Sequence, residues 1–151
     1  KDLTVIGVLT GCMLFMADLV RAIDVPHRIW VVQASSYRGE TTRPGELRID
    51  TGLLPDIRDR DVLIVDDIFD TGNTMQELVS ALESREPSSV RTVALLIKEG
   101  RSEVEMKPDF HCFQIPDVFV IGYGLDYGGR YRNLPHIGIL TPQEPKAVAQ
   151  R

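Results

Sequence analysis

The sequence has 151 residues, of which 43% are hydrophobic, and this is enough for one domain with a substantial core. Its net charge of −5 argues against nucleic acid as a partner, and no apolar run is long enough to favour a membrane partner. Cys12 and Cys112 form neither a CxxC motif nor a disulfide scaffold, which favours a cytoplasmic protein. We expect a single domain over residues 1–151 that a further N-terminal segment can precede, with a poorly ordered tail at 141–151.

Short apolar runs alternate with helical patterns along most of the chain. After the first run, Phe15, Leu19 and Ile23 share one face of a helix. This alternation predicts an α/β fold with a mainly parallel sheet flanked by helices, and in such sheets ligands bind at the carboxyl ends of the strands. The runs that predict strands are residues 3–9, 28–34, 47–51, 62–65, 90–97, 118–121 and 137–140.

A polar segment, residues 35–46, separates the second and third predicted strands. It begins with Ser35, Ser36, Tyr37 and Arg38 and contains two glycines and a proline further on. A connection of this length is either slack between two strands or a functional lid. The tyrosine, the arginines and the hydroxyls favour the lid only weakly.

The chain is organised around residues 62–74, which read VLIVDDIFDTGNT. Four apolar residues predict a strand buried on both faces, and we expect it to end at the acidic pair Asp66 and Asp67. A short loop of hydroxyl, amide and glycine follows. Thr74 and Glu77 then form a capping box, which predicts that a helix starts at Thr74.

A strand, a loop of small residues and a helix N-terminus make a site for an anion, because unpaired amides and the helix dipole favour negative charge. The acidic pair would repel that anion, so it must serve another group. Adjacent carboxylates can accept hydrogen bonds from sugar hydroxyls, directly or through a hydrated divalent cation. The stretch therefore predicts a ribose phosphate site, although two acids alone can also simply end a strand.

The same stretch resembles the phosphoribosyl diphosphate binding motif of type I phosphoribosyltransferases, which has four apolar residues, two acids and a D-T/S-G-x-T loop in this order. From Leu3 to about Leu140 the chain is similar to the hypoxanthine-guanine phosphoribosyltransferase family. The matching stretches are ADLVRA at 17–22, SSY at 35–37, VLIVDDIFDTGNTM at 62–75, KPDF at 107–110, and IPD, FVIGY and LDY between 115 and 127.

The resemblance implies an activity as well as a fold. Members of this family transfer ribose 5-phosphate from phosphoribosyl diphosphate to a 6-oxopurine in purine salvage, and release diphosphate with Mg²⁺. The chain is therefore expected to be a pentosyltransferase that makes the nucleotide from hypoxanthine or guanine on a type I phosphoribosyltransferase fold. The family also implies a homodimer or homotetramer.

The resemblance gives the central stretch its roles. Asp66 and Asp67 would hold the ribose hydroxyls and their Mg²⁺, and the loop amides with the Thr71 and Thr74 hydroxyls would hold the 5′-phosphate. Asp70 would be the general base that takes a ring proton from the purine. The expected ribose and phosphate residues are Asp66, Asp67, Asp70, Thr71, Gly72, Asn73 and Thr74.

The purine would be held by residues further along the chain. Lys98 would donate to the 6-oxo group, which favours hypoxanthine or guanine over adenine, whose amino group presents a second donor. Phe119 would stack on the ring, and the Val120 backbone would meet the exocyclic position. Asp126 would hold a second Mg²⁺ through water.

Diphosphate would contact Thr10, Gly11 and Arg132, and Ser36 and Tyr37 would belong to the closing lid. Thr10 stands where many members of the family carry lysine, so its contact would be made mainly by the backbone. Magnesium and arginine suit a leaving group that gains negative charge.

Two further departures from the family pattern are Asn73 and Val118, which replace lysines of the animal enzymes and put affinity in doubt more than reaction type. A competing interpretation is a non-catalytic regulator on the same fold that binds phosphoribosyl diphosphate and nucleic acid. A third interpretation is a different phosphoribosyltransferase, which would need another base-recognition segment. Asp70, Lys98 and Phe119 are all present, which favours the purine enzyme over both.

Overall fold

The computed structural model of the chain describes residues 2–36, 47–49 and 54–141. Its centre is a six-stranded sheet in the order β3-β2-β1-β4-β5-β6, parallel throughout except for the antiparallel pairing of β2 with β3. The strands are β1 Leu3–Leu9, β2 His27–Ser36, β3 Leu47–Ile49, β4 Asp61–Phe69, β5 Ser89–Lys98 and β6 Phe110–Ile115. The expected mainly parallel α/β fold is confirmed.

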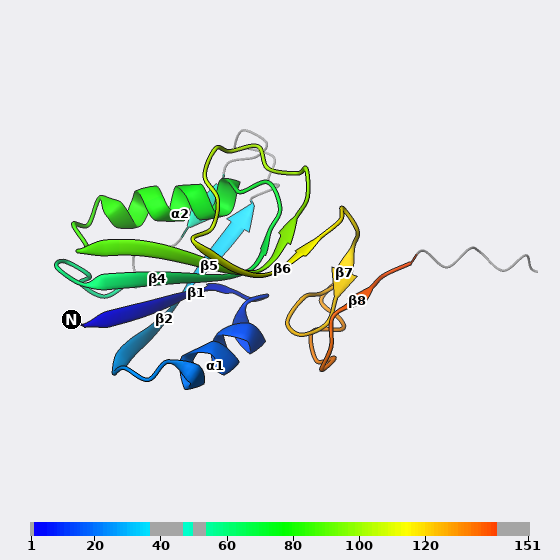
Figure 1. The fold of residues 1–151 in the computed structure, drawn as a ribbon, viewed down its shortest axis with the longest axis horizontal. Helices are drawn as coiled ribbons and strands as arrows, with labels where there is room; N and C mark the ends of the chain where they lie inside the picture. Colours follow the sequence, from blue (N-terminus) through cyan, green and yellow to red (C-terminus); the bar gives the residue numbers. More distant parts are fainter. Residues whose placement is uncertain (1, 37–46, 50–53, 142–151) are drawn as a thin grey trace, which may run out of the picture.

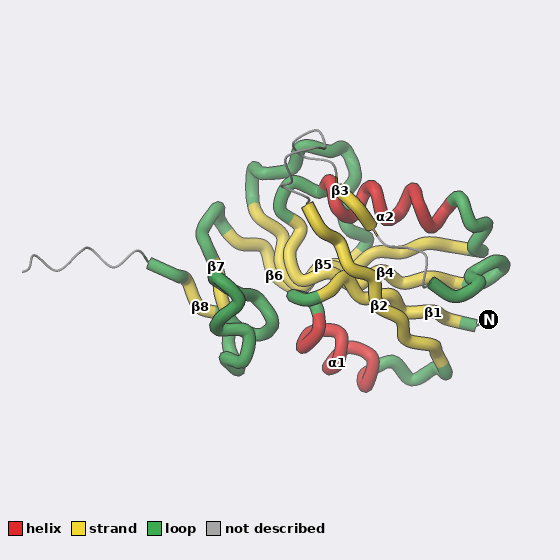
Figure 2. Tube along the Cα trace, turned by 180° about the vertical axis from the view of Figure 1, so that it is seen from behind, coloured by secondary structure: helices red, strands yellow, loops and turns green. Residues whose placement is uncertain are grey.

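One helix covers each face of the sheet (Figures 1 and 2). Helix α1, Met13–Ala22, packs against β1 and β4, and helix α2, Asn73–Glu83, packs against β4 and β5 on the other side. Val5 and Ile6 are both fully buried, although successive side chains on a strand point to opposite faces. Burial on both faces explains why the central strands read as unbroken apolar runs.

A small lobe follows the sheet. Its two strands, β7 Val120–Ile121 and β8 Gly138–Ile139, pair antiparallel. In Figure 1 the lobe lies beyond the ends of the parallel strands, on the side opposite the label N. It therefore faces the carboxyl ends of β1 and β4, where a ligand of a parallel sheet is expected.

β4 is longer than predicted. The run 62–65 was expected to end at the acidic pair, but β4 continues to Phe69, so Asp66 and Asp67 lie inside the strand. The backbone of Asp66 stays in register with Ala94 of β5. The ladder continues because strand pairing uses backbone groups, which the acidic side chains leave free.

The predicted capping box is wrong. Helix α2 begins at Asn73 rather than Thr74, and its N-cap is Gly72, whose φ of 89° is left-handed and which makes no side-chain cap hydrogen bond. A β carbon at Gly72 would lie 2.4 Å from Val104 Cγ2 and 2.6 Å from Phe69 Cζ. The chain therefore turns into the helix at a position where both the space and the positive φ require glycine.

Three other strand predictions need correction or restriction. β6 was not predicted, since its side chains are almost all exposed at the sheet edge and give no apolar run. The predicted buried strand 118–121 shrinks to β7, and Phe119 is half exposed. β3 agrees with the prediction over its three residues, and the rest of that prediction falls on residues 50–51, outside the described ranges.

No helix within these described ranges is long and apolar enough to cross a membrane.

Candidate active site

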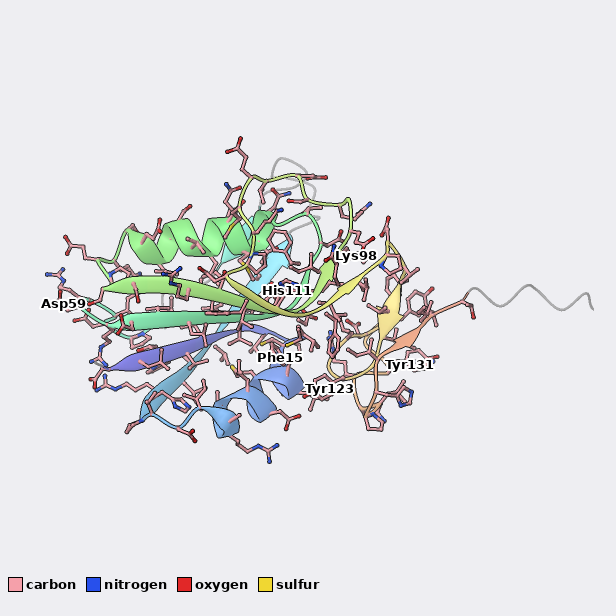
Figure 3. The ribbon with its side chains drawn as sticks, viewed as in Figure 1. Phe15, Asp59, Lys98, His111, Tyr123 and Tyr131 are labelled. Atoms are coloured by element: carbon pink, nitrogen blue, oxygen red, sulfur yellow. The ribbon has the colours of Figure 1, made fainter. Side chains whose placement is uncertain are left out.

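The site lies where β1, β4 and β5 end against the β7–β8 lobe. Figure 3 shows Lys98, the last residue of β5, on the lobe side of the molecule, and Asp59 at the opposite end of the sheet. The predicted residues of the β1 turn, the acidic pair and the lobe meet at this edge.

The acidic pair is desolvated. Asp66 is buried and Asp67 is half-buried, and each accepts a hydrogen bond through Oδ1 from the next backbone amide, at 2.9 Å from Asp67 N and 3.0 Å from Ile68 N. Burial raises the pKa of Asp66 well above its usual range, and the charge of Asp67 adds to this. Burial also raises the pKa of Asp67. Two crowded carboxylates with raised pKa values form a donor set that suits a hard divalent cation.

Gly11 closes over this pair. A β carbon at Gly11 would lie 1.6 Å from Asp67 Oδ2, and one at Gly124 would lie 2.0 Å from the carbonyl oxygen of Gly11. The Gly11 backbone therefore lies directly between the Asp67 carboxylate and the backbone of Gly124, which brings together three segments distant in sequence. Thr10 is exposed, its peptide bond with Leu9 is cis, and its carbonyl accepts from Met13 N at 3.2 Å.

The loop between β4 and α2 forms a small pocket of about 60 Å³, roughly the space of two water molecules in the liquid. A pocket this small suits a group the size of a phosphate. Asn73 Nδ2 donates to Thr71 Oγ1 at 3.2 Å and to Glu103 Oε2 at 3.0 Å, so the Asn73 side chain braces the loop. The residues lining the pocket are Asp66, Ile68, Phe69, Asp70, Thr71, Gly72, Thr74 and Met75.

The lobe supplies the aromatic part of the site. Phe119 is 50% exposed, and the edge-to-face contact with Tyr127, with ring centroids 5.6 Å apart, leaves much of the Phe119 ring open. Val120 follows in β7 and is buried, in register with Ile139. The open ring is the feature expected of a stacking platform.

Arg132 and Asp126 lock the lobe internally. Arg132 Nη2 lies 2.8 Å from Asp126 Oδ1, and Arg132 Nη1 donates to the carbonyl of Gly124 at 2.6 Å. Asp126 Oδ2 accepts from Gly129 N at 2.7 Å. The positive charge of Arg132 also reaches the acidic pair, where it opposes the effect of burial on the pKa of Asp67.

A charged ring, defined here as Asp70, Lys98, Arg101 and Asp117, lies beside the loop between β4 and α2. Lys98 Nζ is 3.6 Å from Asp70 Oδ2 and 3.3 Å from Asp117 Oδ1. Arg101 Nε is 2.8 Å from Asp70 Oδ1, and its Nη1 is 3.7 Å from Asp117 Oδ2. Both carboxylates therefore contact both cations, and the structure places Lys98 next to Asp70.

Sequence reasoning did not place Arg101 or Asp117 in the site. Both belong to segments that the sequence brings to notice, a charged loop at 99–109 and the IPD motif at 115–117. Neither pattern indicates where a side chain points, so the sequence drew attention to the two segments but not to Arg101 and Asp117 themselves.

The predicted metal ligands form two separate groups. Among the described residues no three His, Cys, Asp or Glu side chains gather into one cluster that could hold a metal ion. Asp126 therefore does not complete a set with Asp66 and Asp67. Of the predicted lid, Ser36 ends β2 with its backbone in register with Leu47, and Tyr37 lies outside the described residues.

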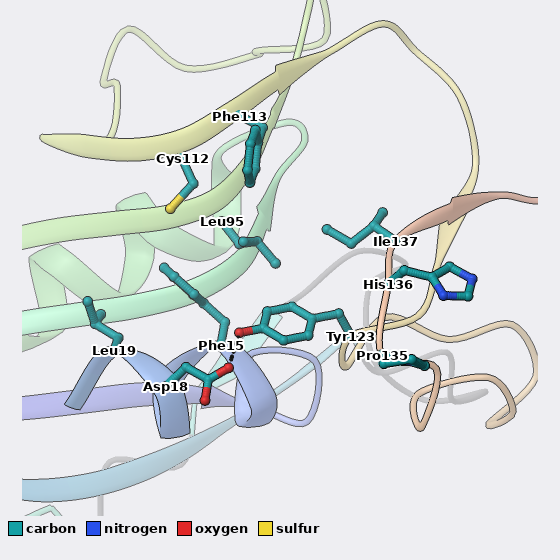
Figure 4. A pocket seen from close by; sticks show the side chains of 10 residues that line it. All are labelled: Phe15, Asp18, Leu19, Leu95, Cys112, Phe113, Tyr123, Pro135, His136 and Ile137. Carbon is teal, nitrogen blue, oxygen red and sulfur yellow. Dashed lines mark hydrogen bonds between the residues drawn. The ribbon is translucent and has the colours of Figure 1, made fainter. Parts of the chain in front are cut away.

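A second cavity, of about 510 Å³, lies beside α1 and away from the charged ring. Figure 4 shows Phe15 and Leu19 of α1 on one side of it and Phe113 of β6 on another. The Tyr123 hydroxyl donates to Asp18 Oδ2 at 2.5 Å across its mouth, so the lobe is tied to α1 there.

Comparison with known proteins agrees with this geometry. The phosphoribosyl transferase domain family matches residues 1–128. Hypoxanthine phosphoribosyltransferase of Salmonella typhimurium is 44% identical over 138 residues, which cover 91% of this chain and 78% of that protein. Hypoxanthine-guanine phosphoribosyltransferase of Bacillus subtilis is 44% identical over 137 residues, with 91% and 76% covered.

The same likeness holds in three dimensions. The crystal structure of a hypoxanthine phosphoribosyltransferase from Staphylococcus aureus superposes with a TM-score of 0.86 at 42% identity, covering 94% of this chain and 77% of that one. The expected type I phosphoribosyltransferase fold and pentosyltransferase class are thereby confirmed. The chain belongs to the hypoxanthine-guanine phosphoribosyltransferase family.

Proposed function

We propose that the chain transfers ribose 5-phosphate from phosphoribosyl diphosphate to hypoxanthine or guanine and releases diphosphate, a reaction of purine salvage. One observation carries the proposal. A phosphate-sized pocket, a desolvated acidic pair and a lysine next to a carboxylate meet at the same sheet edge, facing a lobe with an open aromatic ring. These parts match the phosphate, the sugar and the base of one nucleotide.

The phosphate and sugar take the β4 side of the cleft. The 5′-phosphate binds the amides and hydroxyls of residues 70–74, where the unpaired amides at the start of α2 and the helix dipole favour an anion. The ribose hydroxyls bind Asp66 and Asp67, whose carboxylates accept hydrogen bonds. Because two carboxylates stand side by side with crowded negative charge, they would also hold Mg²⁺, which supplies positive charge toward the diphosphate when it is bound.

The purine takes the lobe side. Lys98, whose side chain is 12% exposed, donates to the 6-oxo group, and Phe119 stacks on the ring. The Val120 backbone meets the exocyclic position. Asp126 holds a second Mg²⁺ through water, using the carboxylate lone pairs that Arg132 and Gly129 N leave free.

Asp70 is the general base. It takes a proton from the imidazole ring of the purine as the attacking nitrogen bonds to the anomeric carbon. The leaving diphosphate is held by the backbone at Thr10 and Gly11 and by Arg132, whose guanidinium already lies at this edge of the cleft. Ser36 and Tyr37 belong to the lid that excludes water, which would otherwise hydrolyse the sugar donor.

The chain works as a homodimer or homotetramer in a reducing cytoplasm. Support for self-association comes from β6, an edge strand on which Phe110 and Phe113 are 57% and 59% exposed. Both cysteines are free, Cys12 buried and Cys112 exposed, as a reducing compartment allows. Light scattering after size exclusion should give a mass of two or four chains, whereas a monomer would contradict the assembly.

The base assignment is tested by Asp70→Asn. Nucleotide formation from hypoxanthine, phosphoribosyl diphosphate and Mg²⁺ should fall roughly a hundredfold to ten-thousandfold, the usual contribution of a general base. Asp59→Asn removes the same charge at the far end of the sheet, and that exposed position with φ 58° suits asparagine. It should keep the wild-type rate. Equal rates for Asp70→Asn and the wild type would contradict the role of Asp70.

A further inference from the structure

The loop that carries Arg101 is hydrogen-bonded to the loop between β4 and α2. Glu103 N donates to the carbonyl of Thr71 at 2.9 Å, and Glu103 Oε2 accepts from Asn73 Nδ2 at 3.0 Å. Exposed ion pairs are usually weak because two long side chains must be ordered to form them. Here the backbone that carries Arg101 is already fixed next to the loop that carries Asp70, so less ordering is needed.

Within the charged ring, Arg101 lies closer to the Asp70 carboxylate than Lys98 does. Arg101 Nε contacts Asp70 at 2.8 Å, within the normal range of a charge-assisted hydrogen bond. Lys98 Nζ lies 3.6 Å from Asp70 Oδ2, beyond hydrogen-bond distance, and donates to Asp117 Oδ1 at 3.3 Å. Arg101 Nη1 lies 3.7 Å from Asp117 Oδ2. An entering 6-oxo group can therefore draw Lys98 away from Asp70 at small cost, while Arg101 stays hydrogen-bonded to Asp70. Arg101 is then the cation of the ring that still contacts both acids.

We propose that Arg101 is a positioning residue for the transfer reaction, resting on the proposed function of this cleft. It fixes Asp70 through Oδ1, so that Oδ2, which Lys98 releases, faces the imidazole ring of the purine. That ring loses its proton to Oδ2 while the attacking nitrogen bonds to the anomeric carbon and diphosphate leaves with the bonding electrons. Arg101 itself touches neither substrate.

The first test is Arg101→Gln in the full chain, with hypoxanthine, phosphoribosyl diphosphate and Mg²⁺. The value of kcat should fall about tenfold to a hundredfold, as when a reacting group is displaced by about 1 Å, while KM for phosphoribosyl diphosphate stays near the wild-type value. Arg101→Lys keeps the charge and should recover part of the loss. A purely structural role would change thermal stability without this split between kcat and KM.

The second test is a double-mutant cycle with Asp70→Asn. If Arg101 acts through Asp70, Arg101→Gln should cost little further once Asp70 has lost its charge. Arg58→Gln is the matched control, because Arg58 forms an exposed ion pair with Glu86 at 3.3 Å and should keep the wild-type kcat.

The outcomes separate the two claims. An unchanged kcat in Arg101→Gln, or an equal loss in the Asp70→Asn background, overturns the positioning role and leaves the proposed function standing. A wild-type chain that forms no nucleotide overturns the proposed function and the role of Arg101 together.

Discussion

Gly11 shows how closely single residues determine the geometry of the cleft. Its α carbon lies against the Asp67 carboxylate, and its carbonyl lies against Gly124 of the lobe. Any side chain at Gly11 would occupy the position of Asp67 Oδ2. The glycine is therefore required by space, since its backbone fills the gap between the Asp67 carboxylate of β4 and the backbone of the lobe at Gly124.

Gly11→Ala should displace the Asp67 carboxylate and lower kcat/KM for phosphoribosyl diphosphate by at least about tenfold, equivalent to about 1.4 kcal/mol of transition-state binding. Gly138→Ala is the control, because the nearest atom to its new β carbon is His136 Cδ2 at 4.0 Å. Steady-state kinetics of both variants check this. Similar kinetics for Gly11→Ala and Gly138→Ala would show that the close approach to Asp67 is unimportant for activity.

At the scale of elements, the strands buried on both faces were predictable and the exposed ones were not. β1 was predicted with its observed ends, because burial on both sides gives it a nearly continuous apolar run, with Thr4 as the polar exception. β6 was missed, since hydrogen bonding to β5 at the sheet edge imposes no apolar pattern on its sequence. The start of α2 was misplaced because Gly72 determines it through packing against Phe69, a contact that a capping pattern does not report.

Two buried threonines on different strands of the sheet are expected to respond in opposite ways to replacement by valine. Thr4 of β1 is fully buried, and its hydroxyl has no hydrogen-bond partner among the described residues. Thr92 of β5 is equally buried, but its hydroxyl donates to Asp109 Oδ2 at 2.9 Å and accepts from Asp109 N at 2.9 Å.

Thr4→Val should raise the free energy of unfolding by about 1 kcal/mol, because it removes an unpaired polar group from the core. Thr92→Val should lower it by about 1 to 3 kcal/mol, because it leaves Asp109 N without its acceptor and takes one of two donors from Asp109 Oδ2. Urea unfolding of both variants checks the pair. Destabilisation of the same size in both would contradict the difference in hydrogen bonding.

The contact of Tyr123 with Asp18 ties the lobe to α1. This hydrogen bond, together with partial burial and the charge of Asp18, raises the pKa of Tyr123 to about 12. Because the folded-state value lies above the ordinary value of 10.0, the contact stabilises the fold below about pH 10 and is lost as the pH rises toward 12.

Tyr123→Phe should therefore be less stable than the wild type between pH 6 and about 9, and the difference should shrink above about pH 10. In an ultraviolet titration, the variant should also lack the tyrosine whose pKa is about 12. Tyr131→Phe alters an exposed ring whose hydroxyl has no hydrogen-bond partner among the described residues. It should change neither the stability nor the signal of the tyrosine that titrates near pH 12. A stability difference for Tyr123→Phe that persisted undiminished at pH 12 would rule out the hydrogen bond as its cause.

At the scale of the whole molecule, the meeting of distant motifs at one sheet edge was predictable from the parallel topology alone. Gly11, Asp67 and Lys98 each follow or end an apolar run, and parallel strands end together. The contact of Arg101 with Asp70 was not predictable, because it joins residues 31 positions apart through the path of a charged loop. Loop paths depend on packing that periodicity does not encode.

In the proposed function, this cleft selects a 6-oxopurine and joins it to ribose 5-phosphate. The most direct measurement is nucleotide formation by the purified chain with Mg²⁺ and phosphoribosyl diphosphate, offering hypoxanthine, guanine, xanthine and adenine separately. Turnover of hypoxanthine or guanine with little turnover of adenine is the expected result, because Lys98 in its proposed role would donate to a 6-oxo acceptor and oppose a 6-amino donor. Binding of phosphoribosyl diphosphate without turnover of any base would contradict the account and favour a regulator built on the same fold.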